Sequence, residues 1–451
     1  LPVAWHRRGG RALHQRRQQL ATARDRVRAT YEALVADESA DRLRARLAEL
    51  GEGLTAEANL FDVDLAAART ELDAAAAAQK AKYDYKASYG DMLPQISLGA
   101  DSTRNHSESA DGTGSTSDGA SYGISASQSL FTGGRNRAAV HSASARLKSV
   151  EADLSDRRAT LSYDVRSAFA QLLFAQEQVD LAREIAKRRK ENLELIQLRY
   201  EGGRENKGAV LLTQASSRDA EFGVAQAERF LVVARRQLAR VLGRDEADEF
   251  QIAGKLEAGR PAAAADYEAL AAETPAHWRA VAQLFVARAA LASAKSQYFP
   301  ELSAKASAGR NGEDWVPEQD EWFLGLTLNF PFFQGGKNVM NVRGAGADLV
   351  RAEADLRAAD ADIVVNLQKA QTDFADAVDQ AEVNAAYLKA EEVRAEIGRS
   401  QYAAGMLSFE DWDRIENDLI SSQKSDLAGR RNAVVAEANW EKAQGKSRLP
   451  E

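Results

Sequence analysis

The chain contains no cysteine among its 451 residues, which excludes disulfides, thiol nucleophiles and thiolate metal sites. Long apolar runs are also missing, and no stretch approaches the roughly 20 consecutive apolar residues that a membrane-spanning helix needs. We see no signal peptide in the sequence, because the opening residues lack a charged segment followed by an apolar core. Proline is scarce, with only 8 residues, and this scarcity permits long uninterrupted helices.

Several kinds of chemistry find no support in the sequence. The net charge is −8 with both signs spread along the chain, whereas general nucleic-acid binding needs a basic face. The 5 histidines are scattered without the paired spacing of a metal site, and no glycine-rich phosphate loop is present. We therefore expect no enzyme activity, no catalytic residue, no cofactor, no metal and no nucleic-acid partner.

Helical patterns occupy most of the chain, since alanine, glutamate, arginine, leucine and glutamine supply high helix propensity. Helices are predicted over residues 62–89, 136–199, 209–241, 266–298 with a possible restart at Pro275, 338–400 with interruptions at Gly344, Gly346 and Gly398, and 409–443. The run from 136, about 64 residues long, would reach roughly 95 Å. Residues 1–58 are predicted to be an Arg-rich helical leader of unclear role. A solvated leader is the favoured interpretation, and a patch for nucleic acid or lipid head groups is the alternative.

Four short segments alternate apolar and polar residues with a period of two, which is typical of strands with one apolar face. They cover residues 95–107, 120–131, 302–309 and 321–333. The polar segments 108–119 and 309–320 lack any periodicity, so they predict exposed loops that join the two strands of each pair.

The sequence repeats itself once. Phe131 to Asn136 matches Phe333 to Asn338, and Tyr200 to Gly203 matches Tyr402 to Gly405, both at an offset of 202 residues. Leu93-Pro94 likewise matches Phe299-Pro300 before the first strand of each half. A repeat of this length is a whole structural half. We therefore divide the chain into the leader 1–58, a first repeat 59–254 and a second repeat 255–451.

Helices of this length need partners of similar length. We expect the helix at 209–241 to stack end to end with 266–298, and 409–443 to stack with 62–89, each pair lying beside one long helix. Four strands alone would leave two bare edges, whereas three chains would supply twelve strands for a closed barrel. The predicted fold is mostly α with a small β part: a long antiparallel helical tunnel, plus four strands per chain that complete a twelve-stranded barrel in a trimer.

In such a barrel one face of each strand would meet lipid and the other a wet lumen. The candidate lipid-facing residues share the apolar side of their strands and are Ile96, Leu98, Ile124, Trp322, Leu324, Leu326 and Leu328. A small soluble sheet packed on a helix is the alternative from the strands alone.

The combined pattern resembles the TolC-like outer-membrane efflux proteins over about residues 60–445. The resemblance rests on Leu-Pro or Phe-Pro before each strand pair and on Phe-x-Gly-Gly-(Arg/Lys)-Asn before each long helix. It also rests on Arg199-Tyr200-x-x-Gly203 and Gln401-Tyr402-x-x-Gly405 at the two helical hairpins. It implies a homotrimer in outer-membrane lipid, with a periplasmic tunnel, that works with a periplasmic adaptor (membrane fusion) protein and an inner-membrane transporter. The chain would be a passive duct for small molecules or proteins in tripartite efflux or type I secretion. A periplasmic coiled-coil adaptor and a rod-shaped scaffold are the alternatives.

The resemblance also implies a tip, formed by the two helical hairpins, that constricts at rest or docks the adaptor. The candidate residues are Tyr200, Gly203, Arg204, Tyr402, Gly405, Asp411 and Arg414. Tyr402 matches the family's gate tyrosine and Asp411 one gate acid, but Leu407 stands where a gate arginine would be and Arg414 where a second acid would be. Helix capping and solvation of the tip are the alternative role for these residues.

Overall fold

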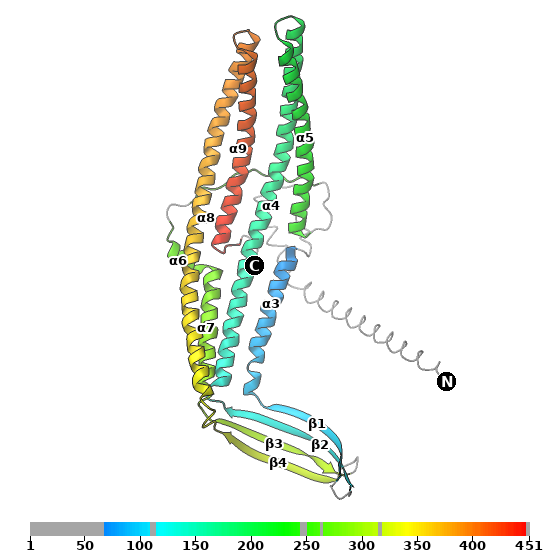
Figure 1. Ribbon diagram of the computed structural model, residues 1–451, viewed down its shortest axis with the longest axis vertical. Coiled ribbons are helices and arrows are strands. Elements are labelled where there is room, and N and C mark those ends of the chain that lie inside the picture. Colours follow the sequence, from blue (N-terminus) through cyan, green and yellow to red (C-terminus); the bar gives the residue numbers. More distant parts are fainter. Residues whose placement is uncertain (1–66, 109–113, 244–249, 262–264, 314–317, 448–451) are drawn as a thin grey trace, which may run out of the picture.

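The computed structural model describes residues 67–108, 114–243, 250–261, 265–313 and 318–447, which form a long helical rod with a small sheet at one end (Figure 1). The leader predicted over 1–58 lies outside these residues. The two longest helices are α4 (Arg135–Glu201) and α8 (Lys337–Ala403), each with 67 residues. At 1.5 Å per residue each is about 100 Å long, as the sequence predicted.

The glycines that interrupt the helical pattern do not break α8, which runs as one continuous helix from Lys337 to Ala403, as expected for the second half. A glycine inside a helix costs only about 1 kcal/mol relative to alanine. Gly398 has a packing reason, since a Cβ built on it would lie 3.1 Å from Cδ1 of Ile415. The glycine therefore lets two helices approach closely and does not end one.

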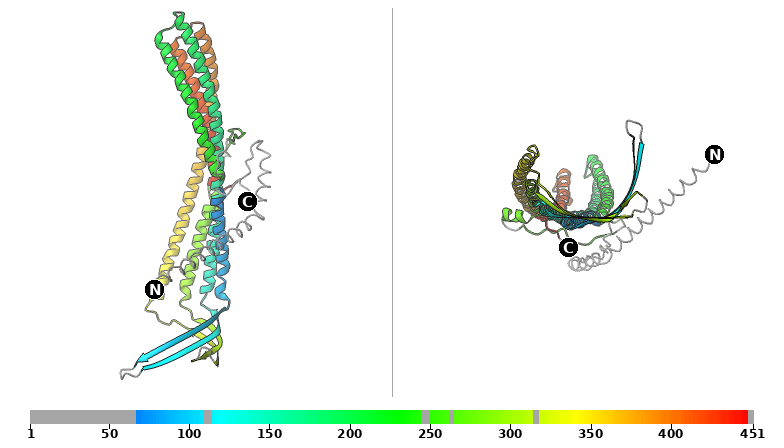
Figure 2. Two further views of the ribbon diagram at one scale, coloured as in Figure 1. Left: turned by 90° about the vertical axis from the view of Figure 1, so that its right-hand side faces the viewer. Right: turned by 90° about the horizontal axis from the view of Figure 1, so that it is seen from below.

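The sheet contains four antiparallel strands in the order β1-β2-β3-β4. Their bounds are β1 (Gln95–Glu108), β2 (Gly114–Phe131), β3 (Glu301–Gly312) and β4 (Gln319–Asn329). All four strands were predicted, and β1 and β4 are the two edges of the sheet. Seen from below, strands and helices follow one arc that stays open on one side (Figure 2).

The predicted loops were too long. β2 begins at Gly114 and its first residues pair with the outer part of β1, from Glu108–Gly114 to Thr103–Gly119. β3 likewise continues to Gly312, and β4 starts at Gln319. These segments lack an apolar face, so alternation could not reveal them. They form strands through backbone pairing and through polar cross-strand contacts such as the bidentate ion pair of Arg104 with Asp118.

The end of the last strand was predicted too late. β4 stops at Asn329, and residues 330–334 continue outside the ladder. Pro331 explains the stop, because proline has no backbone N–H to donate to a neighbouring strand.

The helices form one layer with the same order as the strands. Near the sheet, neighbouring helices run α3 (Ala67–Ala87), α4, α7 (Pro275–Ser296) and α8. Farther from the sheet the order is α5 (Lys207–Leu242), α4, α9 (Phe409–Ala443) and α8 (Figure 1). The short helices α6 (Tyr267–Glu273) and η1 (Gly90–Met92) complete the described elements.

The predicted stacking of the short helices was wrong. α5 continues into α3 along α4, and α9 continues into α7 along α8 (Figure 1). Gly445, just past α9, lies against Pro275 at the start of α7. The strand hairpins explain this arrangement. Because β1 pairs with β2, the helix that enters β1 must lie beside the helix that leaves β2, and the same holds for β3 and β4.

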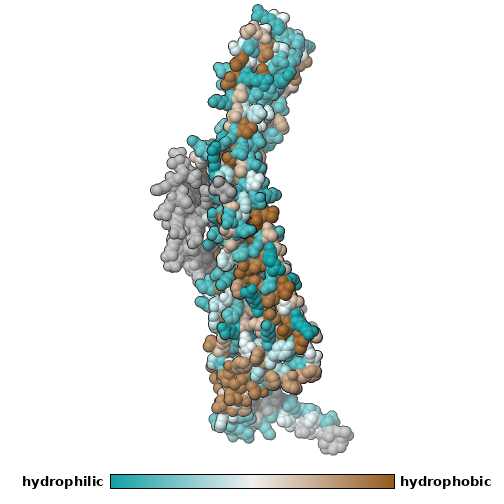
Figure 3. Space-filling view, turned by 90° about the vertical axis from the view of Figure 1, so that its left-hand side faces the viewer, coloured by the Kyte–Doolittle hydropathy of each residue, from teal (hydrophilic) through white to brown (hydrophobic). Residues whose placement is uncertain are grey.

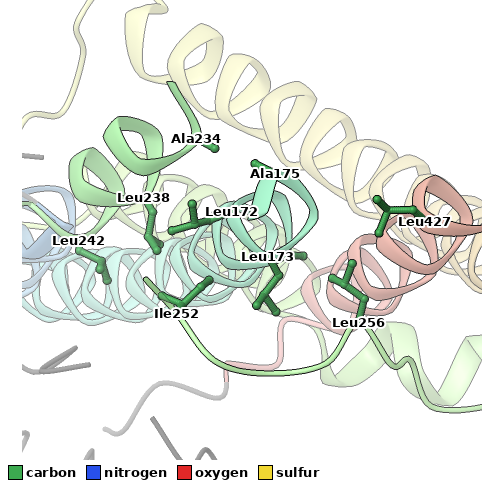
Figure 4. Close-up of a cluster of buried hydrophobic side chains, with 10 residues drawn as sticks. Leu172, Leu173, Ala175, Ala234, Leu238, Leu242, Ile252, Leu256 and Leu427 are labelled. Carbon is green, nitrogen blue, oxygen red and sulfur yellow. The ribbon is translucent and has the colours of Figure 1, made fainter. Parts of the chain in front are cut away.

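A hydrophobic cluster holds the middle of the layer (Figure 4). Leu172 and Leu173 of α4 meet Leu238 of α5 and Leu427 of α9, together with Ile252 and Leu256 from the segment 250–261. The side-chain amide of Gln176 forms two hydrogen bonds with the backbone of Ile252, donating to its C=O at 2.9 Å and accepting from its N–H at 3.0 Å. The segment 250–261 therefore joins α4, α5 and α9 in the middle of the layer.

Candidate functional site: the hairpin tip and the sheet face

Each hairpin turns through a glycine in the left-handed conformation. Gly203 has φ +68° and Gly405 has φ +76°. Behind them, the N–H of Arg204 donates to the C=O of Arg199, and the N–H of Met406 donates to the C=O of Gln401. These bonds close the helix ends as in a Schellman motif. The capping role predicted as the alternative for Gly203 and Gly405 is therefore present.

The two tip tyrosines lie in different surroundings although they occupy matching places in the repeat. Tyr200 is 42% exposed, whereas Tyr402 is only 1% exposed. Tyr402 belongs to a small apolar cluster with Ile196 of α4, Ala209 of α5, and Phe409 and Trp412 of α9. All four helices of the tip contribute to this cluster, so it joins the two hairpins of one chain.

Tyr402 makes directed contacts with both hairpins. Its hydroxyl donates to Oε2 of Glu205 in the first turn at 2.9 Å. The guanidinium of Arg199 lies 4.3 Å from the ring centroid, and its Nη1 donates to the C=O of Tyr402 at 2.8 Å. The indole of Trp412 stacks on the same ring at 4.5 Å and an angle of 2°. We call Arg199, Glu205, Tyr402 and Trp412 the tip clamp.

These contacts have substantial energies for such a small cluster. A desolvated cation–π contact contributes about 2 kcal/mol, and a stacked aromatic pair adds about 0.5–1.5 kcal/mol beyond its burial. Burial raises the pKa of the Tyr402 phenol well above its ordinary value, and the hydrogen bond to Glu205 raises it further. The hydroxyl therefore remains a donor to Glu205 over the whole neutral range.

Asp411 and Arg414 lie at the start of α9 and outside the clamp. Ser408 caps this helix by accepting from the N–H of Asp411 at 3.1 Å, and its hydroxyl donates to the Asp411 carboxylate at 2.9 Å. Arg414 approaches the same carboxylate at 3.4 Å, and both side chains are more than half exposed. Within one chain Asp411 is thus a capping acid, and Leu407 packs against the apolar cluster. Arg204 is exposed on the first turn.

Buried charges lie directly below the clamp. Glu416 of α9 is 1% exposed, and it accepts two hydrogen bonds from Arg399 of α8 at 2.7 and 3.2 Å. At the seam between the hairpins, where α4 of the first lies beside α9 of the second, the buried Arg189 of α4 pairs with Asp413 of α9 at 3.0 Å. Ion pairs of this kind require close geometry, because each buried charge loses its hydration.

Sequence reasoning noted Arg199 only as part of the repeated hairpin motif, and it missed Trp412, Arg399 and Glu416. The repeat held a signal for Trp412, since at the offset of 202 residues it replaces Val210 of the first hairpin. The sequence also held a signal for Arg189, because this charged residue interrupts an apolar stripe of α4 that includes the buried Ile185 and Ile196. Spacing alone cannot tell which charges on a long helix are solvated and which are buried.

The sheet brings the predicted lipid-facing residues onto one face. Across the four strands, Leu98, Ile124, Ala308 and Trp322 stand opposite one another, and so do Ile96, Ala126, Ala306 and Leu324. Ala304 pairs with Leu326, and Leu302 pairs with Leu328. The other face carries mostly small and polar residues. One of its rows contains Ser97, Ser125, Ser307 and Phe323, and the hydroxyls of Ser97 and Ser125 are 2.7 Å apart.

The apolar face is exposed in the single chain. Leu98 is 85% exposed, and the other six predicted residues are exposed as well. Phe332 and Phe333, just past β4, add two exposed rings. Figure 3 shows hydrophobic surface gathered near the end of the rod that carries the sheet. In the part of the chain that the structure describes, no helix is long and apolar enough to span a membrane. The same residues contain no group of three potential metal-ligating His, Cys, Asp or Glu side chains.

Comparison with known proteins identifies the chain's family. The family described as outer membrane efflux protein matches residues 63–244 and 252–446. The chain belongs to this family. Membership confirms the resemblance inferred from the repeated motifs, and it favours the channel over the adaptor and scaffold alternatives.

One curated relative of this efflux-family chain is the alkaline protease secretion protein AprF of Pseudomonas aeruginosa. It is 24% identical over 270 residues, which cover 58% of this chain and 55% of AprF. The chain thus spans about half the length of that relative.

Solved structures share the fold. The outer-membrane channel OprN has a TM-score of 0.74 at 20% identity, covering 85% of this chain and 88% of OprN. The outer membrane protein VceC of Vibrio cholerae has a TM-score of 0.73 at 18% identity, covering 83% of this chain and 92% of VceC. These likenesses confirm the predicted fold class, a helical tunnel with a small sheet.

Proposed function

We propose that this chain is one of three identical subunits of an outer-membrane duct. The sheets of three chains form a twelve-stranded barrel in lipid, and the helices form a tunnel that reaches into the periplasm. The observation that carries the proposal is the sheet itself. It has two open edges, β1 and β4, and an exposed apolar face built from seven predicted residues.

The open edges support association with further copies. An edge strand presents unpaired N–H and C=O groups, and a closed barrel removes such edges. β1 and β4 are the edges of one chain, so β4 of one copy can pair with β1 of the next. The edge helices α5 and α8 carry exposed apolar side chains as well, among them Phe222, Val233, Val383 and Tyr387.

The length of the apolar face supports contact with lipid. Trp322 and Phe330 lie eight residues apart on and just past β4. At about 3.3 Å per residue they delimit roughly 26 Å of strand, close to the band of about 25 Å typical of membrane barrels with aromatic residues at both boundaries. The polar opposite face then lines a wet lumen.

The hairpin tip is the periplasmic end in this proposal. The candidate residues Tyr200, Gly203, Arg204, Tyr402, Gly405, Asp411 and Arg414 all lie there. The tip constricts the duct at rest and meets a periplasmic adaptor protein, and an inner-membrane transporter supplies the energy. The duct itself conducts passively. AprF is named for the secretion of an alkaline protease, which supports proteins as one class of cargo, and the family is described by efflux.

The experiment is to extract the full chain with detergent and reconstitute it in planar bilayers. We expect an SDS-resistant trimer that migrates differently after heating and that conducts ions. A chain that is monomeric in plain buffer and never conducts would contradict the duct and favour a scaffold. A chain that binds an efflux transporter but forms no channel would favour the adaptor.

A further inference from the structure

We infer that Arg199 and Trp412 are positioning residues of the gate, because they sandwich the ring of Tyr402 and thereby hold the two hairpins of one chain together at the closed tip. The inference rests on the proposed duct and names a pair of residues that control its constriction.

The repeats place opposite chemistry at matching positions of the tip. Leu407, Phe409 and Trp412 of the second hairpin correspond, at the offset of 202 residues, to Glu205, Lys207 and Val210 of the first. The second hairpin therefore supplies a leucine and two aromatic rings, while the first supplies two charged groups and a valine. Tyr402 is buried and Tyr200 exposed for this reason, since only the second hairpin offers its tyrosine an aromatic neighbour.

The two partners of Tyr402 occupy opposite faces of its ring. Trp412 stacks in parallel at 4.5 Å, and Arg199 lies over the ring at 4.3 Å. An indole and a guanidinium cannot share one face of a phenol ring at such distances, because their atoms would overlap. The three side chains thus form a stack that runs from α4 through α8 to α9.

Tyr402 is joined to the first hairpin by this stack and by two hydrogen bonds. Arg199 is also fixed to the backbone of Tyr402 by a hydrogen bond of 2.8 Å, and Glu205 accepts from the hydroxyl. Moving the second hairpin away from the first would break the cation–π contact and both hydrogen bonds together. Trp412 moves with Tyr402, so its role is to keep the ring oriented toward Arg199.

The test measures bilayer conductance of the full chain with Trp412→Leu and Arg199→Met. Each change removes one face of the sandwich, so we expect a several-fold rise in mean conductance over the unmodified chain. Arg394→Gln is the matched control. Arg394 pairs with Glu391 and Asp418 inside the second hairpin, and its loss leaves the seam between the hairpins intact. Its conductance should equal that of the unmodified chain.

A second measurement reports the spacing of the hairpins directly. The chain has no cysteine, so Gln214→Cys on α5 and Lys424→Cys on α9 can carry spin labels, with labelled chains diluted into unlabelled trimers. We expect Trp412→Leu and Arg199→Met to lengthen and broaden the distance between the labels. Trp412→Phe and Arg199→Lys retain a ring and a cation, so they should restore the spacing in part.

The outcomes separate the two proposals. If the unmodified chain forms no channel, the proposed duct is wrong, and the gate role of the tip clamp falls with it. If it conducts, but Trp412→Leu and Arg199→Met match Arg394→Gln in both conductance and label distance, the positioning role is wrong. Should Trp412→Leu fail to form the heat-stable trimer, Arg199→Met and Trp412→Phe decide by the same two measurements.

Discussion

The two ends of this rod treat their large apolar side chains in opposite ways. At the sheet end, Leu98, Trp322 and Leu326 are exposed, although they share one continuous face. At the tip, Tyr402 and Trp412 are buried by neighbours from the same chain. The apolar face of the sheet therefore needs something outside the chain to cover it, whereas the large apolar side chains of the tip are already covered within one chain.

The largest effect is expected from Leu326→Arg on the apolar face. An arginine near the middle of a lipid-facing strand costs about 2–4 kcal/mol, and a trimer carries three copies. We expect the heat-stable trimer to disappear from gels. Thr327→Arg is the control, because Thr327 stands on the polar face opposite Ser303. Equal loss of trimer in both variants would contradict the assignment of the faces.

At the tip, Arg399→Met should destabilise α9 by about 3 kcal/mol, since it leaves the buried carboxylate of Glu416 without its bidentate partner. Glu416→Leu should cost much less, because the Arg399 side chain is 44% exposed and can turn into water. Hydrogen exchange of the α9 amides measures both. Similar losses of α9 stability in the two variants would contradict the pairing of a buried Glu416 with a partly exposed Arg399.

Tyr402→Phe removes only the hydroxyl that donates to Glu205. We expect a loss of about 0.5–1.5 kcal/mol at neutral pH, because the partly exposed Glu205 can find water. The ring stack with Trp412 persists in this variant, so the fluorescence of the tip should change little. A loss of stability as large as that in Arg399→Met would contradict the expectation that the ring stack persists without the hydrogen bond.

The raised pKa of Tyr402 predicts an alkaline dependence. The phenol ionises more readily in the unfolded chain than in the tip, so its contribution to stability is complete below pH 10 and falls as the pH rises above it. Each unit above the ordinary pKa of about 10 costs about 1.4 kcal/mol. Thermal unfolding from pH 8 to 11 should therefore show a steeper decline for the unmodified chain than for Tyr402→Phe. Parallel declines would contradict burial of the phenol.

The smallest effect is expected for Asp411→Ala. Its carboxylate lies in the first turn of α9 and accepts from the capping Ser408, so its loss should cost about 0.3–1 kcal/mol. We expect unchanged bilayer conductance, since Asp411 takes no part in the tip clamp. A clear rise in conductance would instead support the gate role that the family resemblance implied for this acid.

Much of the fold could be predicted because its signals are local. The spacing of apolar residues revealed the long helices α4 and α8, and alternation revealed all four strands and the residues of their apolar face. The outer parts of β1 and β2 escaped prediction, because both of their faces are polar and only the pairing between them makes them strands. The sequence also placed Tyr402, Gly203 and Gly405 at the ends of the long helices, whereas the gate role of the tip stays a prediction.

The sequence by itself determined the duplication, the length of the helices and the alternating faces of the strands, because each depends on residues that are close along the chain. Only the tertiary structure decided that α5 continues into α3 and α9 into α7, since that order follows from which strands pair. It also decided that Arg199 reaches Tyr402 and that Glu416 is buried. Those contacts join residues as much as 203 positions apart, a separation at which periodicity carries no information.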